Sequence, residues 1–275
     1  MIQSKTVARL LMAVGAAVMA LAMLSPMASA KEPAPGYTQF AGCPSVEENP
    51  AAVVCFRSVI NGGHFQMGSK DVPIEKPMTL SGGWDGEFAK FYFNSKGGLS
   101  PVKQKVPGGV IGLTGLTWLL EFLGSEALTL YAVTELTGPN AVTGVDGTNL
   151  SIKVHLVNST LGNNCYVGSS SNPIKLHLIT GVTEPPPPNK PIEGQLPKEV
   201  FTDGLGISHI NKAIFVDNAF AAPGASGCVL TLFGFIPISI NGLVNSQSGL
   251  PAPAGTNETT QNTDSELTLR SLVYP

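Results

Sequence analysis

The chain has 275 residues, of which 43% are hydrophobic and only 13% are charged, about half the charged share of an average globular protein. This composition excludes wholesale disorder, and the scarcity of Lys and Arg excludes nucleic-acid binding that depends on neutralising phosphates. With 31 Gly and 22 Pro residues, the sequence also excludes a helical bundle or a coiled coil. A loop-rich, mainly β protein remains.

The first 30 residues have the three parts of a secretory signal peptide. Lys5 and Arg9 provide positive charge, residues 10–24 form an uncharged apolar run, and Ala28 and Ala30 are the small residues of a cleavage site. The run is shorter than the roughly 20 residues that a membrane-spanning helix needs. We predict cleavage after Ala30, which changes the net charge from −3 to −5, and a secreted or envelope-associated product that does not span a membrane.

Four cysteines follow the predicted cleavage site: Cys43, Cys55, Cys165 and Cys228. An even number in an oxidising compartment predicts two disulfides, for which three pairings are possible. We favour Cys43–Cys55, because these two are close in sequence, together with Cys165–Cys228 in the second half of the chain. The Cys-x-x-Cys spacing of zinc ribbons and redox sites does not occur, so we predict neither a metal nor another cofactor.

Residues 31–52 are Pro-rich and polar, and they predict an N-terminal arm held by Cys43. Beyond this arm, short apolar stretches are separated by Gly, Pro and Asn, as is typical of strands. The first strands are expected at residues 53–60 and 63–67, with Asn61-Gly62 as a hairpin turn between them. Further strands are expected at residues 78–80 and 88–93.

Residues 110–123 are the exception to this β pattern. Four leucines from Leu116 to Leu123 follow the i, i+3, i+4, i+7 spacing of one helical face, and Gly124 is suited to end a helix. We predict a short buried helix. The alternative is a segment that contacts a membrane or a lipid, although the segment is too short to span a bilayer.

The clearest strands lie in the second half of the chain. Apolar and polar residues alternate over residues 128–136, 150–156 and 174–178, which puts one face of each strand on a core and the other towards solvent. A final strand is expected at residues 267–273. The sequence therefore predicts a mainly β fold, an antiparallel β-sandwich-like domain over residues 53–275 with one short buried helix and two disulfides.

Four consecutive prolines lie within residues 183–197 and favour polyproline II structure. This segment suits a linker between domains, a motif that binds a partner, or a rigid surface loop. Because a Cys165–Cys228 disulfide joins its two flanks, we favour a stiff loop within a single domain.

An internal repeat joins residues 152–157 to residues 174–179, each with the pattern Ile-Lys-aliphatic-His-Leu-aliphatic. If the two copies pair, their polar members form one cross-strand cluster on the face opposite the aliphatic residues. The members are Lys153, His155, Lys175 and His177. The functional interpretation is an anion-binding patch, and a metal site is the alternative that the lysines disfavour. A shared half-buried environment explains the repeat without any ligand.

The remaining histidines, His64 and His209, give no catalytic assignment. His209 lies near Asp203 and Asp217, but proximity in sequence does not establish a dyad. The nucleophile elbow, the H-E-x-x-H motif, the P-loop and the dinucleotide motif do not occur.

The sequence thus favours a non-catalytic secreted or cell-envelope protein that acts by binding or in a structural role. Its partner is expected to be a cell-envelope component or another secreted protein, and not nucleic acid. The alternatives are a secreted hydrolase with a non-standard site and an envelope protein that associates with lipid.

Several stretches of the chain resemble a group of secreted actinobacterial proteins of unknown function. The stretches are residues 72–77 leading to 80–83, 162–168, 185–188 and 216–224. The resemblance covers most of the mature chain and implies secretion. It implies no activity and no site residue.

Overall fold

The structure is a computed structural model that describes residues 31–87, 90–117, 128–137, 142–144, 147–232 and 236–275. The chain divides into two compact units, Met1–Lys31 and Glu32–Pro275, and every described strand and helix lies in the second. In the described part of the chain, no helix is both long enough and apolar enough to cross a membrane.

β-Strands are the main regular structure, as the sequence predicted, and the helices are few and short. The strands are β1 (Val54–Met67), β2 (Lys70–Pro73), β3 (Met78–Trp84), β4 (Phe91–Tyr92), β5 (Gly98–Leu99), β6 (Gln104–Lys105), β7 (Tyr131–Leu136), β8 (Val142–Gly144), β9 (Gly147–Val157), β10 (Tyr166–Val167), β11 (Ile174–Ile179), β12 (Glu199–Thr202), β13 (Ser208–Asp217), β14 (Ala225–Ser226), β15 (Val229–Leu232), β16 (Ile236–Ser239) and β17 (Glu258–Leu269). The described helices are η1 (Thr38–Phe40), α2 (Gly109–Thr114), α4 (Asn241–Ser248) and α5 (Arg270–Val273).

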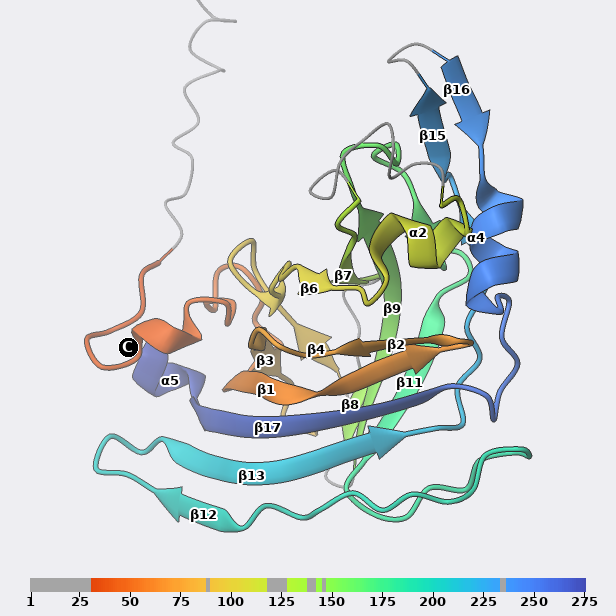
Figure 1. Ribbon diagram of the computed structural model, residues 1–275. Helices are drawn as coiled ribbons and strands as arrows, with labels where there is room; N and C mark the ends of the chain where they lie inside the picture. The colour runs from red at the N-terminus through yellow and green to blue at the C-terminus, as the bar shows by residue number, and fades with distance from the viewer. Residues whose placement is uncertain (1–30, 88–89, 118–127, 138–141, 145–146, 233–235) are drawn as a thin grey trace, which may run out of the picture. The chain divides into compact units, whose positions relative to one another are not determined.

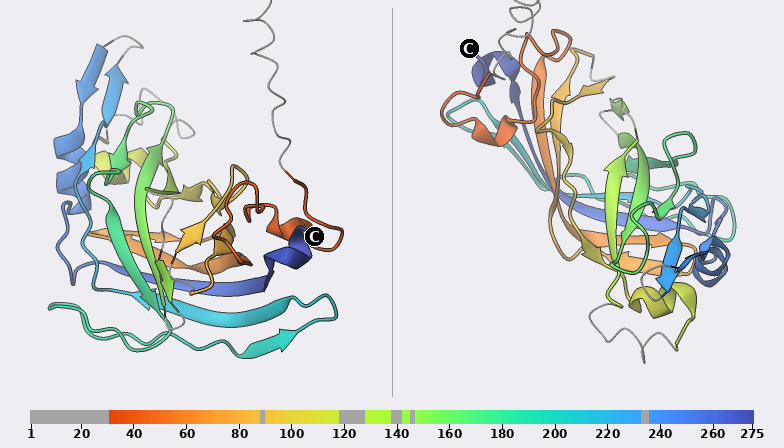
Figure 2. Two further views of the ribbon diagram at one scale, coloured as in Figure 1. Left: turned by 180° about the vertical axis from the view of Figure 1, so that it is seen from behind. Right: turned by 90° about the horizontal axis from the view of Figure 1, so that it is seen from above.

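Fifteen of these strands form one antiparallel sheet that curls into a half-barrel (Figure 1). The main path runs β14-β10-β9-β11-β13-β17-β1-β3-β4, and β15 with β16 forms a separate two-stranded ribbon. A single pair of the described ladder, Ile179 with Val216, joins β11 to β13, so the sheet can change direction there. Figure 2 shows β9 and β11 turned towards the wall that β1, β13 and β17 form.

The prediction of an antiparallel, mainly β fold is therefore confirmed. The sequence favoured a sandwich-like core, whereas in the structure two parts of one continuous sheet face each other. Both arrangements bury alternate residues of each strand, so the alternation at residues 150–156 and 174–178 fits either of them. The buried side chains of these two stretches are Leu150, Ile152, Val154, Leu156, Ile174, Leu176 and Leu178.

The predicted hairpin turn at Asn61-Gly62 is wrong. β1 runs through these residues without turning, and its register against β17 shifts between Ile60 and Gly62, which is a β-bulge. A Cβ at Gly63 would lie 1.9 Å from the Thr260 carbonyl oxygen, and the φ of Gly63 is +114°, so the bulge requires glycine there. The same residue types that suit a tight turn also suit a bulge.

The predicted helix over residues 110–123 is shorter in the structure. α2 ends at Gly115, whose φ of 72° is left-handed and whose N–H donates to the Ile111 carbonyl oxygen. Val110 and Leu113 are buried, while residues 118–123 lie outside the described residues. The left-handed glycine ends the helix before most of the leucine stripe begins.

The end of the chain also differs from the prediction of a final strand at residues 267–273. β17 begins at Glu258 and ends at Leu269, and the last predicted strand residues form α5. The sequence missed most of β17 because no residue from Glu258 to Glu266 is apolar.

Both predicted disulfides, Cys43–Cys55 and Cys165–Cys228, are present, and they indicate an oxidising compartment. The Pro-rich segment is held against the body by Asn189, whose side-chain amide donates to the carbonyl oxygens of Asn218 and Asn257.

Candidate ligand-binding cavity

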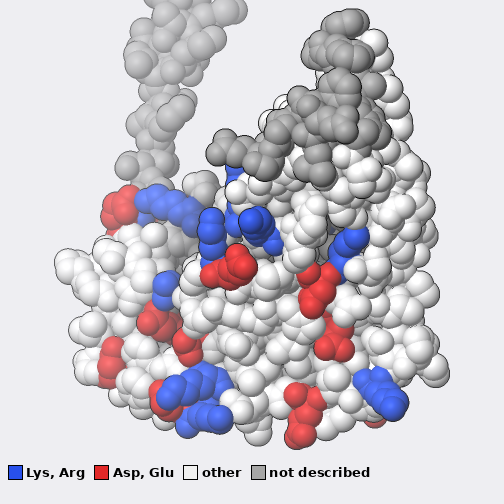
Figure 3. All heavy atoms as spheres, in the orientation of Figure 1, with Lys and Arg blue, Asp and Glu red and all other residues white. Residues whose placement is uncertain are grey.

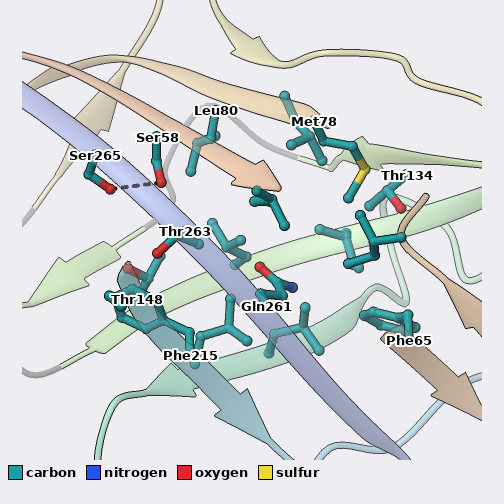
Figure 4. A pocket seen from close by; sticks show the side chains of 18 of the residues that line it. Ser58, Phe65, Met78, Leu80, Thr134, Thr148, Phe215, Gln261, Thr263 and Ser265 are labelled. Atoms are coloured by element: carbon teal, nitrogen blue, oxygen red, sulfur yellow. Dashed lines mark hydrogen bonds between the residues drawn. The ribbon is translucent and has the colours of Figure 1, made fainter. Parts of the chain in front are cut away.

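The curled sheet encloses a cavity of about 490 Å³ between its two facing walls (Figure 4). One wall is formed by the inner faces of β1, β3, β13 and β17, and the other by the inner faces of β7, β9 and β11. Cavities of this size bind small molecules when they are mainly apolar and carry a few convergent polar groups.

Apolar side chains dominate both walls, and none of the residues that line the cavity is charged. β1 contributes Phe56, Ile60 and Phe65, which alternate with residues that point to the outer face. Trp84 on β3 stacks on Phe56 with ring centroids 4.4 Å apart, so an indole ring forms part of the wall. Leu150, Ile152, Leu176 and Leu178 face these groups from β9 and β11.

Apolar residues also mark the mouth of the cavity. Leu196 and Val200 line it, yet they are 72% and 66% exposed. Val200 belongs to the edge strand β12 and pairs with Ile210, whose side chain lines the cavity as well. An apolar surface that continues from the interior to solvent suits the entry of an apolar ligand.

A row of polar side chains on β17 interrupts the apolar wall. Gln261, Thr263 and Ser265 are alternate residues of the strand and point into the cavity (Figure 4). The Ser265 hydroxyl donates to Ser58 Oγ on the neighbouring strand over 2.9 Å. Within the described chain, the Thr263 hydroxyl oxygen is buried without a hydrogen-bond partner. The Gln261 side chain, which is 6% exposed, makes no hydrogen bond to a described residue.

The repeat that predicted an anion patch is divided by the register of its strands. Ile174 pairs with Ile152, so Lys175 and His177 run away from Lys153 and His155. The strands pair antiparallel as expected, and all four polar side chains lie on the outer face. The four residues do not form one cluster, however, because the two copies overlap only at their first residue.

Each half of the repeat has its own partners. The Lys153 ammonium lies 3.1 Å from Glu135 and 4.3 Å from the centre of the Tyr166 ring. His155 stacks on the same ring and lies 3.6 Å from Glu135. His177 Nδ1 lies 2.7 Å from Asn149 Oδ1. The negative charge of Glu135 opposes the binding of an anion at Lys153.

The other two histidines also lie on the outer face and contact carboxylates. His64 Nδ1 is 2.9 Å from Asp71, and His209 Nε2 is 3.2 Å from Asp203. The Ile207 N–H, and secondarily His209, donate to Asp203 and hold the pKa of its carboxyl below the usual value. None of the four histidines lines the cavity.

Asp217, the other carboxylate that lies near His209 in sequence, is almost fully buried at the end of β13. Burial raises the pKa of its carboxyl, although the N–H groups of Ala219 and His177 donate to it. The carboxylate therefore fastens β11 and the chain after β13 to each other, and it contacts the His177 backbone rather than the imidazole.

Charged residues are unevenly distributed on the face that Figure 3 shows. Lys, Arg, Asp and Glu are scattered over the left, central and lower parts of this face, whereas the white surface at the upper right, where β15, β16 and α4 lie, shows none. Residues 218–257 contain no charged residue.

In comparisons with known proteins, no family model, no curated protein and no solved structure matches the chain.

Proposed function

We propose that this chain is a secreted, non-catalytic binding protein that holds a lipid-like molecule inside its curled sheet. The observation that carries the proposal is the cavity of about 490 Å³, whose lining is largely apolar and uncharged. An apolar ligand that fills it removes hydrocarbon surface from water on both sides, at roughly 25 cal/mol for each Å². The exposed Leu196 and Val200 at the mouth extend the same surface outwards.

The hydrolase alternative depended on a cleft that brings histidines and carboxylates together. The histidine–carboxylate contacts lie on the outer face, in separate places along β1, β9 and β13. The geometry of the cavity supports binding better than catalysis, because its walls offer hydroxyl and amide groups but no imidazole or carboxylate.

Quenching of Trp84 fluorescence tests the proposal, because this indole lines the cavity. Replacing Trp118, the other tryptophan, with Phe leaves Trp84 as the only fluorophore of its kind. A fatty-acid ester with a brominated chain is expected to quench Trp84 in a saturable manner. An ester that leaves Trp84 unquenched at every concentration would contradict the proposal.

A matched pair of variants identifies the cavity as the place of binding. Ala213→Phe fills the cavity from β13, and we expect it to weaken binding at least about tenfold. Ser151→Phe adds the same ring to the outer face of β9, opposite Lys175, and is expected to leave binding unchanged. Equal effects of the two variants would place the ligand elsewhere.

Contact with a lipid surface is a second candidate, favoured by the uncharged end of the molecule. Ile236 and Ile238 of β16 are 41% and 42% exposed, and the β15–β16 ribbon projects from the body (Figure 1). Co-sedimentation with uncharged phospholipid vesicles tests this candidate. Replacing both isoleucines with Ser is expected to abolish co-sedimentation while Trp84 quenching persists.

A further inference from the structure

In the polar row on β17, the Ser265 hydroxyl bonds to Ser58, but Gln261 and Thr263 make no side-chain hydrogen bond to a described residue. β17 is a central strand of the inner wall, with β1 on one side and β13 on the other. Central strands of curled antiparallel sheets commonly have one apolar face towards the core and one polar face towards solvent. β17 instead carries Gln261, Thr263 and Ser265 on its inner face and Asn262 and Asp264 on its outer face.

Neighbouring strands show that apolar residues fit the same layer of the wall. Thr263 lies between Ile60 on β1 and Ala213 on β13, and both neighbours line the cavity. A valine or leucine at these β17 positions would continue the apolar lining. Thr263 therefore carries a cost, because its buried hydroxyl has no partner in the described chain and such a group loses about 1–3 kcal/mol relative to solvation in water.

Gln261 is the residue best placed to bind a polar group of a ligand. Its side chain is only 6% exposed and lines the cavity, and it makes no side-chain hydrogen bond to a described residue. By contrast, the other glutamine in the lining, Gln104, accepts from the N–H groups of Glu75 and Lys76 and donates to the Lys76 carbonyl oxygen. Gln104 is thus hydrogen-bonded within the fold, whereas the Gln261 amide is available to a ligand.

The charge of the lining restricts what that ligand can be. A carboxylate or phosphate placed against Gln261 would lie in an apolar cavity without a counter-ion, which is costly. An amide offers one acceptor oxygen and two N–H donors, so it suits an uncharged group such as an ester carbonyl or a hydroxyl.

We propose that the cavity selects uncharged lipids with an ester or hydroxyl group along or at the end of an apolar chain, and that Gln261 forms hydrogen bonds with this group. Thr263 and the Ser265–Ser58 pair lie alongside Gln261 on the same wall. This inference rests on the proposed function, because it names the chemical class of molecule that the same cavity holds.

Competition among four probes of one chain length tests the selectivity: a fatty acid, its methyl ester, the corresponding alcohol and the corresponding alkane. Each probe displaces the brominated ester from the mature, disulfide-bonded protein, and recovery of Trp84 fluorescence reports its affinity. The ester and the alcohol are expected to bind about fivefold or more tightly than the alkane, the gain of one hydrogen bond. The ionised fatty acid is expected to bind most weakly of the three polar probes.

Gln261→Leu is the decisive variant. It has nearly the same size, and it is expected to reverse the preference, so that the alkane binds more tightly than the ester and the alcohol, whose polar groups are then buried without a partner. Asn262→Leu makes the same chemical change on the outer face of the same strand and is expected to keep the selectivity of the unchanged protein. Because the Gln261 amide makes no hydrogen bond to a described residue, Gln261→Leu should not impair folding.

The outcomes separate this inference from the proposed function. Tight binding of all probes without preference, or selectivity that survives in Gln261→Leu, would overturn the role of Gln261 and leave the binding function standing. Preference for the fatty acid would overturn the assignment to uncharged lipids. If neither the brominated ester nor any probe binds, the proposed function itself is wrong.

Discussion

The inner and outer faces of the curled sheet differ in whether their polar side chains have hydrogen-bond or ion-pair partners. On the outer face, Lys153, His64 and His209 each lie within hydrogen-bond or ion-pair distance of a carboxylate. On the inner face, the Thr263 hydroxyl is buried without a partner in the described chain, and the Gln261 side chain makes no hydrogen bond to a described residue. The partnered groups are accounted for by the fold and its solvent, so the unpartnered ones are the better indicators of a ligand.

Among the predictions, placing a carboxylate on the inner face rather than the outer face is expected to give the largest difference in the free energy of unfolding. Leu178→Asp puts a carboxylate into the uncharged cavity, and we expect it to lower the free energy of unfolding by at least about 4 kcal/mol. Lys175→Asp, on the exposed face of the same strand, is expected to change it by about 0.5 kcal/mol or less. Urea denaturation measures both. A cavity that tolerates Leu178→Asp is filled with water, and the contrast between the faces fails.

Tyr274 provides a buried polar group of a third kind, one that is fully enclosed yet partnered. Its hydroxyl donates to the Cys43 carbonyl oxygen over 2.9 Å. Burial, together with the charges of Glu48 and Glu32, raises the pKa of Tyr274 to about 12. Because the native state holds this proton more tightly than the unfolded chain, the resulting stability is complete below pH ~10 and is lost as the pH rises towards about 12.

Between pH ~10 and about 12, the free energy of unfolding is expected to fall by roughly 2–3 kcal/mol. Denaturant titrations of the unchanged protein and of Tyr274→Phe measure it, and the variant is expected to lose less stability over the same range. Absorbance of the phenolate form provides an independent check, because Tyr274→Phe should remove an ionisation near pH 12. If Tyr274→Phe leaves the absorbance titration near pH 12 unchanged, Tyr274 does not ionise there.

A lysine on the outer face that pairs with a carboxylate is expected to contribute less to the free energy of unfolding than buried Tyr274. Lys153→Met removes the contacts with Glu135 and the Tyr166 ring, and we expect a loss of about 1 kcal/mol that decreases at high salt. Lys175→Met, at the equivalent position of the repeat, is expected to have a negligible effect on the free energy of unfolding. Equal losses would show that the two copies share one environment, as the sequence repeat suggests.

The sequence predicted the faces of strands better than their partners. The alternation at residues 150–156 and 174–178 identified the inward residues correctly, and the cysteine positions identified both disulfides. The bulge at Gly63 depends on its close approach to Thr260, which is distant in sequence, so local residue types predicted a turn instead. Likewise, the strand register that separates the two copies of the Lys-His repeat cannot be predicted from the residues of either copy.

The cavity was not predictable for the same reason, since it forms between strands that are distant in the chain. One signal was present in the sequence: residues 258–266 contain no apolar residue and form a strand nonetheless. Only the placement of β17 between β1 and β13 shows that half of these polar residues point inwards. Under the proposed function, this polar strand at the centre of an apolar wall marks the ligand site, and local sequence patterns miss it.

The smallest expected effect is also the sharpest test of the inner face. Thr259 and Thr263 are both buried and lie on the same face of β17, but the Thr259 hydroxyl donates to the His64 carbonyl oxygen whereas that of Thr263 has no partner in the described chain. Thr263→Val should leave the free energy of unfolding unchanged or raise it by up to about 1 kcal/mol, because it removes an unsatisfied hydroxyl. Thr259→Val should lower it by about 1–2 kcal/mol. Equal losses in urea denaturation would mean that the Thr263 hydroxyl is satisfied within the fold, and the polar row would then need no ligand to explain it.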